Sequence, residues 1–147
     1  MTIYFEEIEL GASYQSAGRT ITETEIILFA GLTGDFVPLH MDEEWVKANT
    51  AYPGRIAHGL LVQGIGEGLA VAGIGEWQIL AFLDVQRSFK APVFPGDRIQ
   101  QNYTVVDKRP SSKDPERGVV TVEIEIVNQK GEVVQTGRNV YMIGGKA

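Results

Sequence analysis

The segment that most constrains how this chain can fold is residues 60–72. Read as a helix, it is apolar on nearly every side, and only Gln63 and Glu67 interrupt it. A helix without a polar face has to be buried. Its three glycines each cost a helix about 1 kcal/mol relative to alanine, so we expect them to let a neighbouring sheet approach closely. The segment therefore predicts a buried central helix over about residues 57–73.

Strand signals follow this helix. The pattern changes to a period of two and predicts strands over residues 79–90, 99–107, 120–126 and 133–143. The third has the clearest alternation, Val and Ile against Thr and Glu, and the first is expected to be buried on one face. Turn residues between the strands indicate an antiparallel meander in sequence order. A long buried helix with such a meander predicts an α+β fold in which the sheet wraps around the helix.

The chain before the central helix begins with a moderately polar stretch, residues 14–21, which predicts a first strand near a sheet edge. Thr22 then opens a second helix. Together with Glu25 it satisfies the capping-box pattern, in which each side chain accepts a hydrogen bond from an exposed backbone N–H. Gly31 and Gly34 are expected to end this helix.

A carboxylate and an imidazole follow that helix within one short segment. Asp35 and His40 lie five positions apart, and Pro38 between them disfavours continuation of the helix, so we expect both to project from a shaped loop. There they could share a water molecule, one taking a proton from it while the other donates one. The structural alternative is that Asp35 caps a turn and His40 packs beside Trp45. Asp42 is expected to cap another short helix.

Composition excludes several classes of protein. The chain of 147 residues is expected to be a single domain, residues 1–147. It has no cysteine and only two histidines, so we expect no disulfide, no metal site and a cytoplasmic location. The net charge of −6 disfavours nonspecific binding to nucleic acid. No segment has the length and hydrophobicity of a membrane span.

Basic residues are concentrated in one part of the chain. Seven of the thirteen Lys and Arg residues lie within residues 87–117. They form either a solvated strand face or a landing place for a small anion such as a phosphorylated cofactor tail. The glycines of the central helix do not form a dinucleotide-binding loop, because Leu69 stands where that motif needs a small residue and no strand precedes it.

Three separated motifs resemble a known family. They read Thr-Gly-Asp-Phe-Val-Pro-Leu-His at 33–40, Ile-Ala-His-Gly-Leu-Leu at 56–61 and Phe-Lys-Ala-Pro-Val-Phe-Pro-Gly-Asp at 89–97. In this order they resemble the MaoC-like, (R)-specific enoyl-CoA hydratase group of hot-dog-fold proteins. The resemblance spans residues 14 to about 142, and it implies the hot-dog form of the α+β fold, with the sheet wrapped around the central helix.

The resemblance also implies an activity. It is the reversible syn addition of water to a trans-2-enoyl-CoA, which gives an (R)-3-hydroxyacyl-CoA. Asp35 and His40 would hold and ionise the water, and the backbone N–H of Gly59 would receive the thioester oxygen. The site would lie at the interface of a homodimer, or of a higher assembly of such dimers. No cofactor is implied, because CoA is part of the substrate.

Five further residues are expected to contact the substrate: Val37, Pro38, His58, Glu67 and Lys90. At the position of Val37, the group commonly has an asparagine, and its loss puts the standard straight-chain substrate in question. His58 is either structural or catalytic. Glu67 is a carboxylate inside an apolar helix, and it is either a satisfied buried acid, a further polar group of the pocket, or exposed.

Two other functions remain open on the same fold. An acyl-CoA thioesterase would direct the activated water at the thioester carbonyl instead of the double bond. A non-catalytic acyl-CoA binding module would use the pocket without turnover, and the unusual Val37 favours it. Release of free thiol distinguishes the thioesterase from the hydratase, because hydration leaves the thioester intact.

Overall fold

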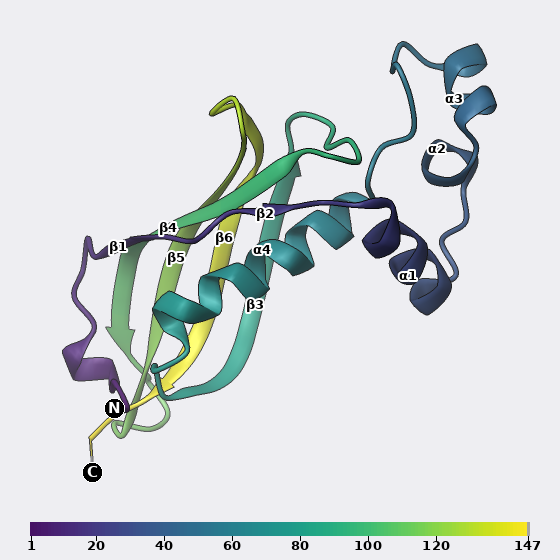
Figure 1. Cartoon of the computed structure of the whole chain (residues 1–147). Helices are drawn as coiled ribbons and strands as arrows, with labels where there is room; N and C mark the ends of the chain where they lie inside the picture. The colour runs from purple at the N-terminus through teal and green to yellow at the C-terminus, as the bar shows by residue number, and fades with distance from the viewer. Residues whose placement is uncertain (147) are drawn as a thin grey trace.

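A computed structural model of the chain describes residues 1–146, and it consists of one curved antiparallel sheet around a central helix, α4 (Gly59–Ile74) (Figure 1). The predicted α+β arrangement is confirmed. The strands are β1 (Ser13–Gln15), β2 (Arg19–Thr20), β3 (Ile79–Phe89), β4 (Arg98–Pro110), β5 (Arg117–Asn128) and β6 (Val133–Gly144). Their order in the sheet is β1-β4-β5-β6-β3, and β2 also pairs with β4.

The core lies between α4 and the inner face of the sheet. The clearest alternation of the sequence is confirmed in β5, where Val120, Val122, Ile124 and Ile126 are all buried and the residues between them face outward. Burial of apolar side chains such as these is the dominant favourable contribution to folding. The sheet thereby fixes the position of α4.

The first long helix, α1 (Glu23–Thr33), begins as the sequence predicts. Thr22 and Glu25 form a capping box, and their hydrogen bond lowers the pKa of the Glu25 carboxyl to about 2. The prediction that Gly31 helps to end the helix is wrong, because a glycine costs a helix too little to interrupt it. Gly34 ends α1, with a φ of 82° that favours glycine.

Three short helices complete the chain: η1 (Phe5–Glu7), α2 (Pro38–Met41) and α3 (Glu43–Asn49). The sequence suggested that Pro38 keeps its segment out of a helix, and this prediction is wrong. Pro38 occupies the first position of α2, where its missing N–H costs the helix nothing. Asp42 caps α3 as predicted, accepting a hydrogen bond of 3.0 Å from the backbone of Trp45. Helices α1, α2 and α3 project together beyond one end of the sheet (Figure 1).

Two predictions about the sheet are wrong. The first strand is not continuous over residues 14–21 but consists of β1 and β2, each paired with β4. The meander covers only β4, β5 and β6, because β1 and β2 occupy the other edge of β4 and leave β3 the free edge of β6. Residues 90–97 carry the chain from β3 back to β4 and pass the start of α4, where the Ala57 N–H donates to the Val93 carbonyl at 2.7 Å.

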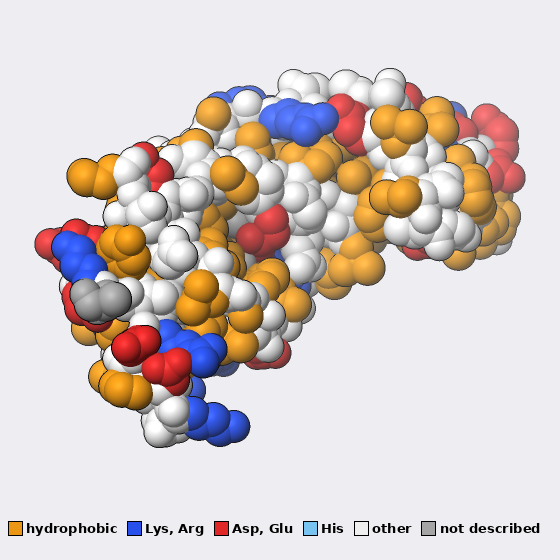
Figure 2. Space-filling view, turned by 90° about the horizontal axis from the view of Figure 1, so that it is seen from below, with side chains coloured by type: hydrophobic (Ala, Val, Ile, Leu, Met, Phe, Trp, Pro, Cys, Tyr) orange, Lys and Arg blue, Asp and Glu red, His pale blue; other side chains and the backbone are white. Residues whose placement is uncertain are grey.

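Much apolar surface stays exposed in the single chain. Leu60 and Val71 of α4 are 64% and 56% exposed, so α4 is not buried on every side as predicted. Strand β3 is exposed on both faces instead of one, and further hydrophobic side chains are visible around the projecting helices (Figure 2). No helix among residues 1–146 combines the length and apolar character needed to cross a membrane.

The glycines of α4 give a stability prediction. Of the three glycines in the middle of α4, only Gly66 is in close contact with the sheet, because a Cβ there would collide with Gln101 and lie 2.8 Å from Cδ1 of Ile126, whereas Gly64 and Gly68 have free space. We expect Gly66→Ala to lower the free energy of unfolding by about 1–3 kcal/mol through overpacking. Gly68→Ala, the matched control, should raise it by up to about 1 kcal/mol. Urea denaturation measures both, and equal effects would contradict the packing.

Candidate functional site

The segment that joins α1 to α2 is held by its own short-range hydrogen bonds. Thr33 Oγ1 donates to the carbonyl of Phe29 at 2.7 Å and accepts from the backbone N–H of Asp35 at 3.3 Å. One Asp35 carboxylate oxygen accepts from the N–H of Val37 at 3.4 Å, a long and therefore weak turn contact. The carboxylate stays half-buried, and it has capacity for further hydrogen bonds.

His40 lies one turn further, in α2, and its ring is fixed in one tautomer. Its Nδ1 lies 2.8 Å from the carbonyl oxygen of Ile56, which can only accept, so Nδ1 carries the proton. In the neutral ring Nε2 is then left as an acceptor. Burial lowers the pKa of His40, and nearby His58 adds to this effect, while the Ile56 carbonyl and Asp35 oppose it. His40 is therefore suited to accept a proton near neutral pH.

His58 packs against His40 and holds it in place. His58 is 2% exposed, and its ring packs on the ring of His40 at a tilt of 31°, with 3.9 Å between the ring centroids. Its Nε2 lies 3.0 Å from the backbone carbonyl of Asp35, to which it donates, and its other face packs on Phe29. His58 thus joins the Asp35 turn to the start of α4 and positions His40.

Asp35, His40 and His58 form one compact group. One potential ligand atom from each lies within 4.8 Å of the others, and within residues 1–146 this is the only such group of three. Asp35 and His40 are therefore close enough to bind one water molecule between them. Carboxylate and imidazole are also metal ligands, so the absence of a metal remains a prediction of the sequence.

Gly59 is the first residue of α4, directly after His58. The early N–H groups of a helix have no partner within the helix, and the helix dipole favours negative charge beside them. The ring of Phe89 packs where a side chain would begin, because a Cβ on Gly59 would lie 2.7 Å from its Cε1 atom. The Gln135 amide donates to the Gly59 carbonyl at 2.8 Å. Contacts from β3 and β6 thus fix a bare backbone at this helix start.

A pocket of about 380 Å³ opens at this helix start. Of the residues singled out from the sequence, it brings together His40, Gly59 and Lys90, whereas Asp35, Val37, Pro38, His58 and Glu67 do not line it. Sequence reasoning missed Tyr52 and Gln135 in the lining. Gln135 is buried in β6, but β6 also carries Thr136, Arg138 and Asn139, so its sequence did not single Gln135 out.

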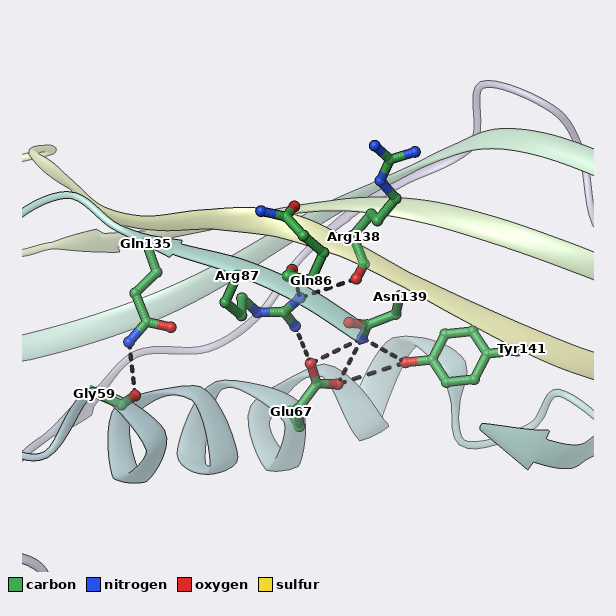
Figure 3. Close-up of polar contacts among 8 residues, drawn as sticks. All are labelled: Gly59, Glu67, Gln86, Arg87, Gln135, Arg138, Asn139 and Tyr141. Atoms are coloured by element: carbon green, nitrogen blue, oxygen red, sulfur yellow. Dashed lines mark hydrogen bonds and ion pairs between the residues drawn. The ribbon is translucent and has the colours of Figure 1, made fainter. Parts of the chain in front are cut away.

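Glu67 lies two turns further along α4 and belongs to a separate polar group. Its carboxylate forms an ion pair with Arg87 and accepts from the Asn139 amide at 2.8 and 3.0 Å, with the Tyr141 hydroxyl 3.5 Å away (Figure 3). We call Glu67, Arg87, Asn139 and Tyr141 the Glu67 cluster. Of the three interpretations from the sequence, the structure favours a satisfied acid, with 24% of the Glu67 side chain exposed.

The basic residues of 87–117 do not form one surface. Arg87 is buried against Glu67, and Lys108 donates to the backbone carbonyls of Phe5 and Ile8. Lys90, in contrast, is exposed and lies at the pocket. Only this residue of the three is placed to meet an anion that enters there.

Comparison with known proteins places this geometry in context. The sequence profile described as "MaoC like domain" matches residues 7–128. An (R)-specific enoyl-CoA hydratase from Rhodospirillum rubrum is 37% identical over 111 residues, which cover 75% of this chain and 74% of that protein. A solved structure, a monoamine oxidase regulatory protein from Archaeoglobus fulgius, superposes with a TM-score of 0.93 at 38% identity and covers 99% of this chain and 97% of that one.

The hot-dog form of the fold, implied by the sequence motifs, is confirmed by a further structure. RV0216 from Mycobacterium tuberculosis, described as a double hot-dog fold, superposes with a TM-score of 0.88 at 20% identity. The match covers 99% of this chain and 45% of that protein.

The buried His40 gives a pH prediction. Because its pKa in the folded state lies below the ordinary value of 6.5, the unfolded chain takes up this proton first as the pH falls. The contribution of His40 to stability is therefore complete above pH 6.5 and is lost as the pH falls toward the lowered value. We expect His40→Gln to reduce the loss of unfolding free energy between pH 7 and pH 5, measured by urea denaturation. An unchanged loss would contradict the burial of a neutral ring.

Proposed function

The chain belongs to the MaoC-like domain family, and from this premise we propose that it catalyses the reversible syn addition of water to a trans-2-enoyl-CoA. The product is an (R)-3-hydroxyacyl-CoA, in line with the (R)-specific hydratase from Rhodospirillum rubrum to which the chain is similar. One observation carries the proposal: a neutral imidazole, His40, and the start of a long helix, Gly59, line the same pocket. The reaction needs no cofactor, and a cytoplasmic location is part of the proposal.

Asp35 and His40 activate the water in this proposal. The water oxygen bonds to the β-carbon of the enoyl group and gives up one proton, while the α-carbon receives one, so water is added and nothing else is released. The proximity of the Asp35 and His40 side chains, which have one ligand atom each within 4.8 Å of the other, supports both transfers through a shared water. We assign the steps to the pair jointly, since interacting acids titrate together.

Gly59 stabilises the charge that forms during the attack. Addition to the β-carbon moves electrons onto the thioester oxygen, and a backbone N–H at a helix start can donate to it. Loss of one such donor costs about 3 kcal/mol of transition-state stabilisation in other enzymes. The ring of Phe89 leaves no room for a Cβ at this position, so the residue that offers the N–H has no side chain beside it.

A second copy of the chain forms part of the proposal. Strand β3 is the last strand of the sheet, and its outer edge carries exposed apolar side chains such as Phe82, Leu83 and Val85. An exposed apolar edge of this length is a site for pairing with another chain. A homodimer would pair two β3 edges and cover the exposed side of α4 near the pocket.

Substitution of the proposed catalytic pair tests the activity. We expect Asp35→Asn and His40→Ala each to lower the hydration rate of crotonyl-CoA by about 10²–10⁴-fold, because each removes one proton-transfer group. Loss of the conjugated ultraviolet band measures the rate. The matched control is Asp107→Asn, which changes an exposed acid in β4 and should leave the hydration rate unchanged. Dialysis against EDTA before the assay should also leave the rate unchanged.

Each alternative function has its own outcome in this assay. Release of free thiol from the substrate, lost in the same two variants, would identify a thioesterase. Tight binding without turnover across straight, branched and dicarboxylic enoyl-CoAs would identify a binding module. Val37 favours this alternative, because it is the N-cap residue of α2 and makes no side-chain hydrogen bond there. Either result would replace the hydratase proposal.

The β3 edge gives a prediction for assembly. Sedimentation equilibrium should give about twice the chain mass of 16.1 kDa, or a higher even multiple. Leu83→Lys places a charge on the edge and should shift the equilibrium toward the single chain. Val106→Lys, at a comparably exposed position on β4, serves as the matched control. A single chain in the unmodified protein would contradict the pairing.

A further inference from the structure

Two buried glutamines lie on the face of the sheet that packs against α4. Gln101 in β4 and Gln135 in β6 belong to one cross-strand row, in which Ile126 of β5 pairs with both. Gln101 is 0% exposed and Gln135 is 2% exposed. A glutamine is rarely buried, because its amide loses hydrogen bonds to water. The two residues differ in the hydrogen bonds that replace those with water.

Gln101 makes no side-chain hydrogen bond within residues 1–146. Both polar atoms of its amide are buried without a partner, beside Gly66 in the middle of α4. Such a group lowers stability, since it gives up water and receives no bond instead. Gln101 is therefore a comparison residue for Gln135, with the same side chain, burial and facing helix.

Gln135 bonds to the backbone at the start of α4. Its Nε2 donates to the Gly59 carbonyl at 2.8 Å (Figure 3), and because a carbonyl can only accept, the orientation of the amide is fixed. Its Oε1 is buried without a partner among residues 1–146. An apolar side chain of similar shape, such as methionine, would avoid this unsatisfied oxygen. Packing alone therefore does not explain a glutamine at this position.

The bonded carbonyl belongs to the peptide group between Gly59 and Leu60, and both residues line the pocket. The first turn of a helix leaves backbone groups unpaired, and glycine has no Cβ to restrict its backbone. The preceding peptide group is held at its own carbonyl, since the Val62 N–H donates to the His58 carbonyl at 3.1 Å. Gln135 thus restrains the second of the two peptide groups that meet at Gly59.

Holding a carbonyl also sets the direction of an N–H. In a trans peptide group the two point in opposite directions from one plane. A hydrogen bond to the carbonyl also polarises the group and strengthens its N–H as a donor. His58, the N-cap residue of α4, makes no side-chain capping bond, so no cap occupies the N–H groups of Gly59 and Leu60. The Gln135 bond therefore acts on donors that are available to a ligand.

We infer that Gln135 is a positioning residue of the proposed reaction, which holds the peptide group between Gly59 and Leu60 so that their N–H groups meet the thioester oxygen. This inference rests on the proposed hydratase function and adds a residue that acts through the backbone of α4. The charge on the thioester oxygen develops in the transition state. Loss of the Gln135 bond therefore lowers kcat more than it changes KM.

Gln135→Met removes the donor and nearly keeps the length of the side chain. In the full-length protein, kcat for crotonyl-CoA should fall about tenfold, with KM changed by less than about threefold. The urea midpoint should not fall, because the unpartnered Oε1 is removed as well. Gln101→Met is the matched control, and it should leave kcat unchanged.

Gln135→Glu gives a second readout and keeps the test open if the methionine variant does not fold. A carboxylate can only accept, whereas a protonated carboxyl group has one O–H to donate to the Gly59 carbonyl. The rate of this variant relative to the unmodified protein should therefore rise as the pH falls from about 8 to about 6, since burial favours the protonated form. Circular dichroism at each pH checks that the variant stays folded.

Butyryl-CoA, which has no double bond to hydrate, measures the donors without turnover. Hydrogen bonds that polarise its thioester carbonyl should lower the C=O stretching frequency of the bound ligand in infrared difference spectra. This shift should be smaller in Gln135→Met and unchanged in Gln101→Met.

Two results would overturn the inference and leave the hydratase proposal intact. One is an unchanged kcat in Gln135→Met, and the other is a lower kcat with a lower urea midpoint and an unchanged infrared shift, which would assign a structural role. If no enoyl-CoA is hydrated, the hydratase proposal fails, and the infrared shift of bound butyryl-CoA alone decides on Gln135. An unchanged shift, or no binding of butyryl-CoA, would then overturn the inference as well.

Discussion

The start of α4 is the constraint on which the rest of the structure depends. At Gly59 the sheet and the helix are so close that the ring of Phe89 occupies the place of a side chain, and the Gln135 amide fixes the carbonyl of the same residue. One position earlier, His58 bonds to the backbone of Asp35. Three parts of the chain that are distant in sequence therefore meet at two consecutive residues, and the proposed site lies where they meet.

The buried histidines near the start of α4 and the ion pair of the Glu67 cluster are each held by backbone or side-chain partners. The packed rings of His40 and His58 each donate to a backbone carbonyl, which fixes the tautomer of each ring. Arg87 and Glu67 follow the same rule with full charges, where a missing partner would cost several kcal/mol. The fixed ring of His40 can therefore hold a water molecule in a defined place together with Asp35.

The parts of this structure that could be predicted from sequence are those set by local chemistry. The capping box at Thr22 and the alternation in residues 120–126 depend only on neighbours in the chain, and both were found as predicted. The place of β3 beside β6 depends on which sheet edges other strands occupy, which no local pattern reports. Arg87 meets Glu67 for the same nonlocal reason. The order of the sequence motifs indicated the main residues of the proposed site. The residues that line the pocket could be identified only from the structure.

The central claim is that water held by Asp35 and His40 adds to the double bond of a thioester whose oxygen lies at Gly59. The most direct measurement is the fate of heavy oxygen when crotonyl-CoA is incubated with the protein in heavy-oxygen water. We expect the label in the hydroxyl group on the β-carbon of an intact (R)-3-hydroxyacyl-CoA, with none in a free acid. Label in a released carboxylic acid, or an (S) product, would contradict this account.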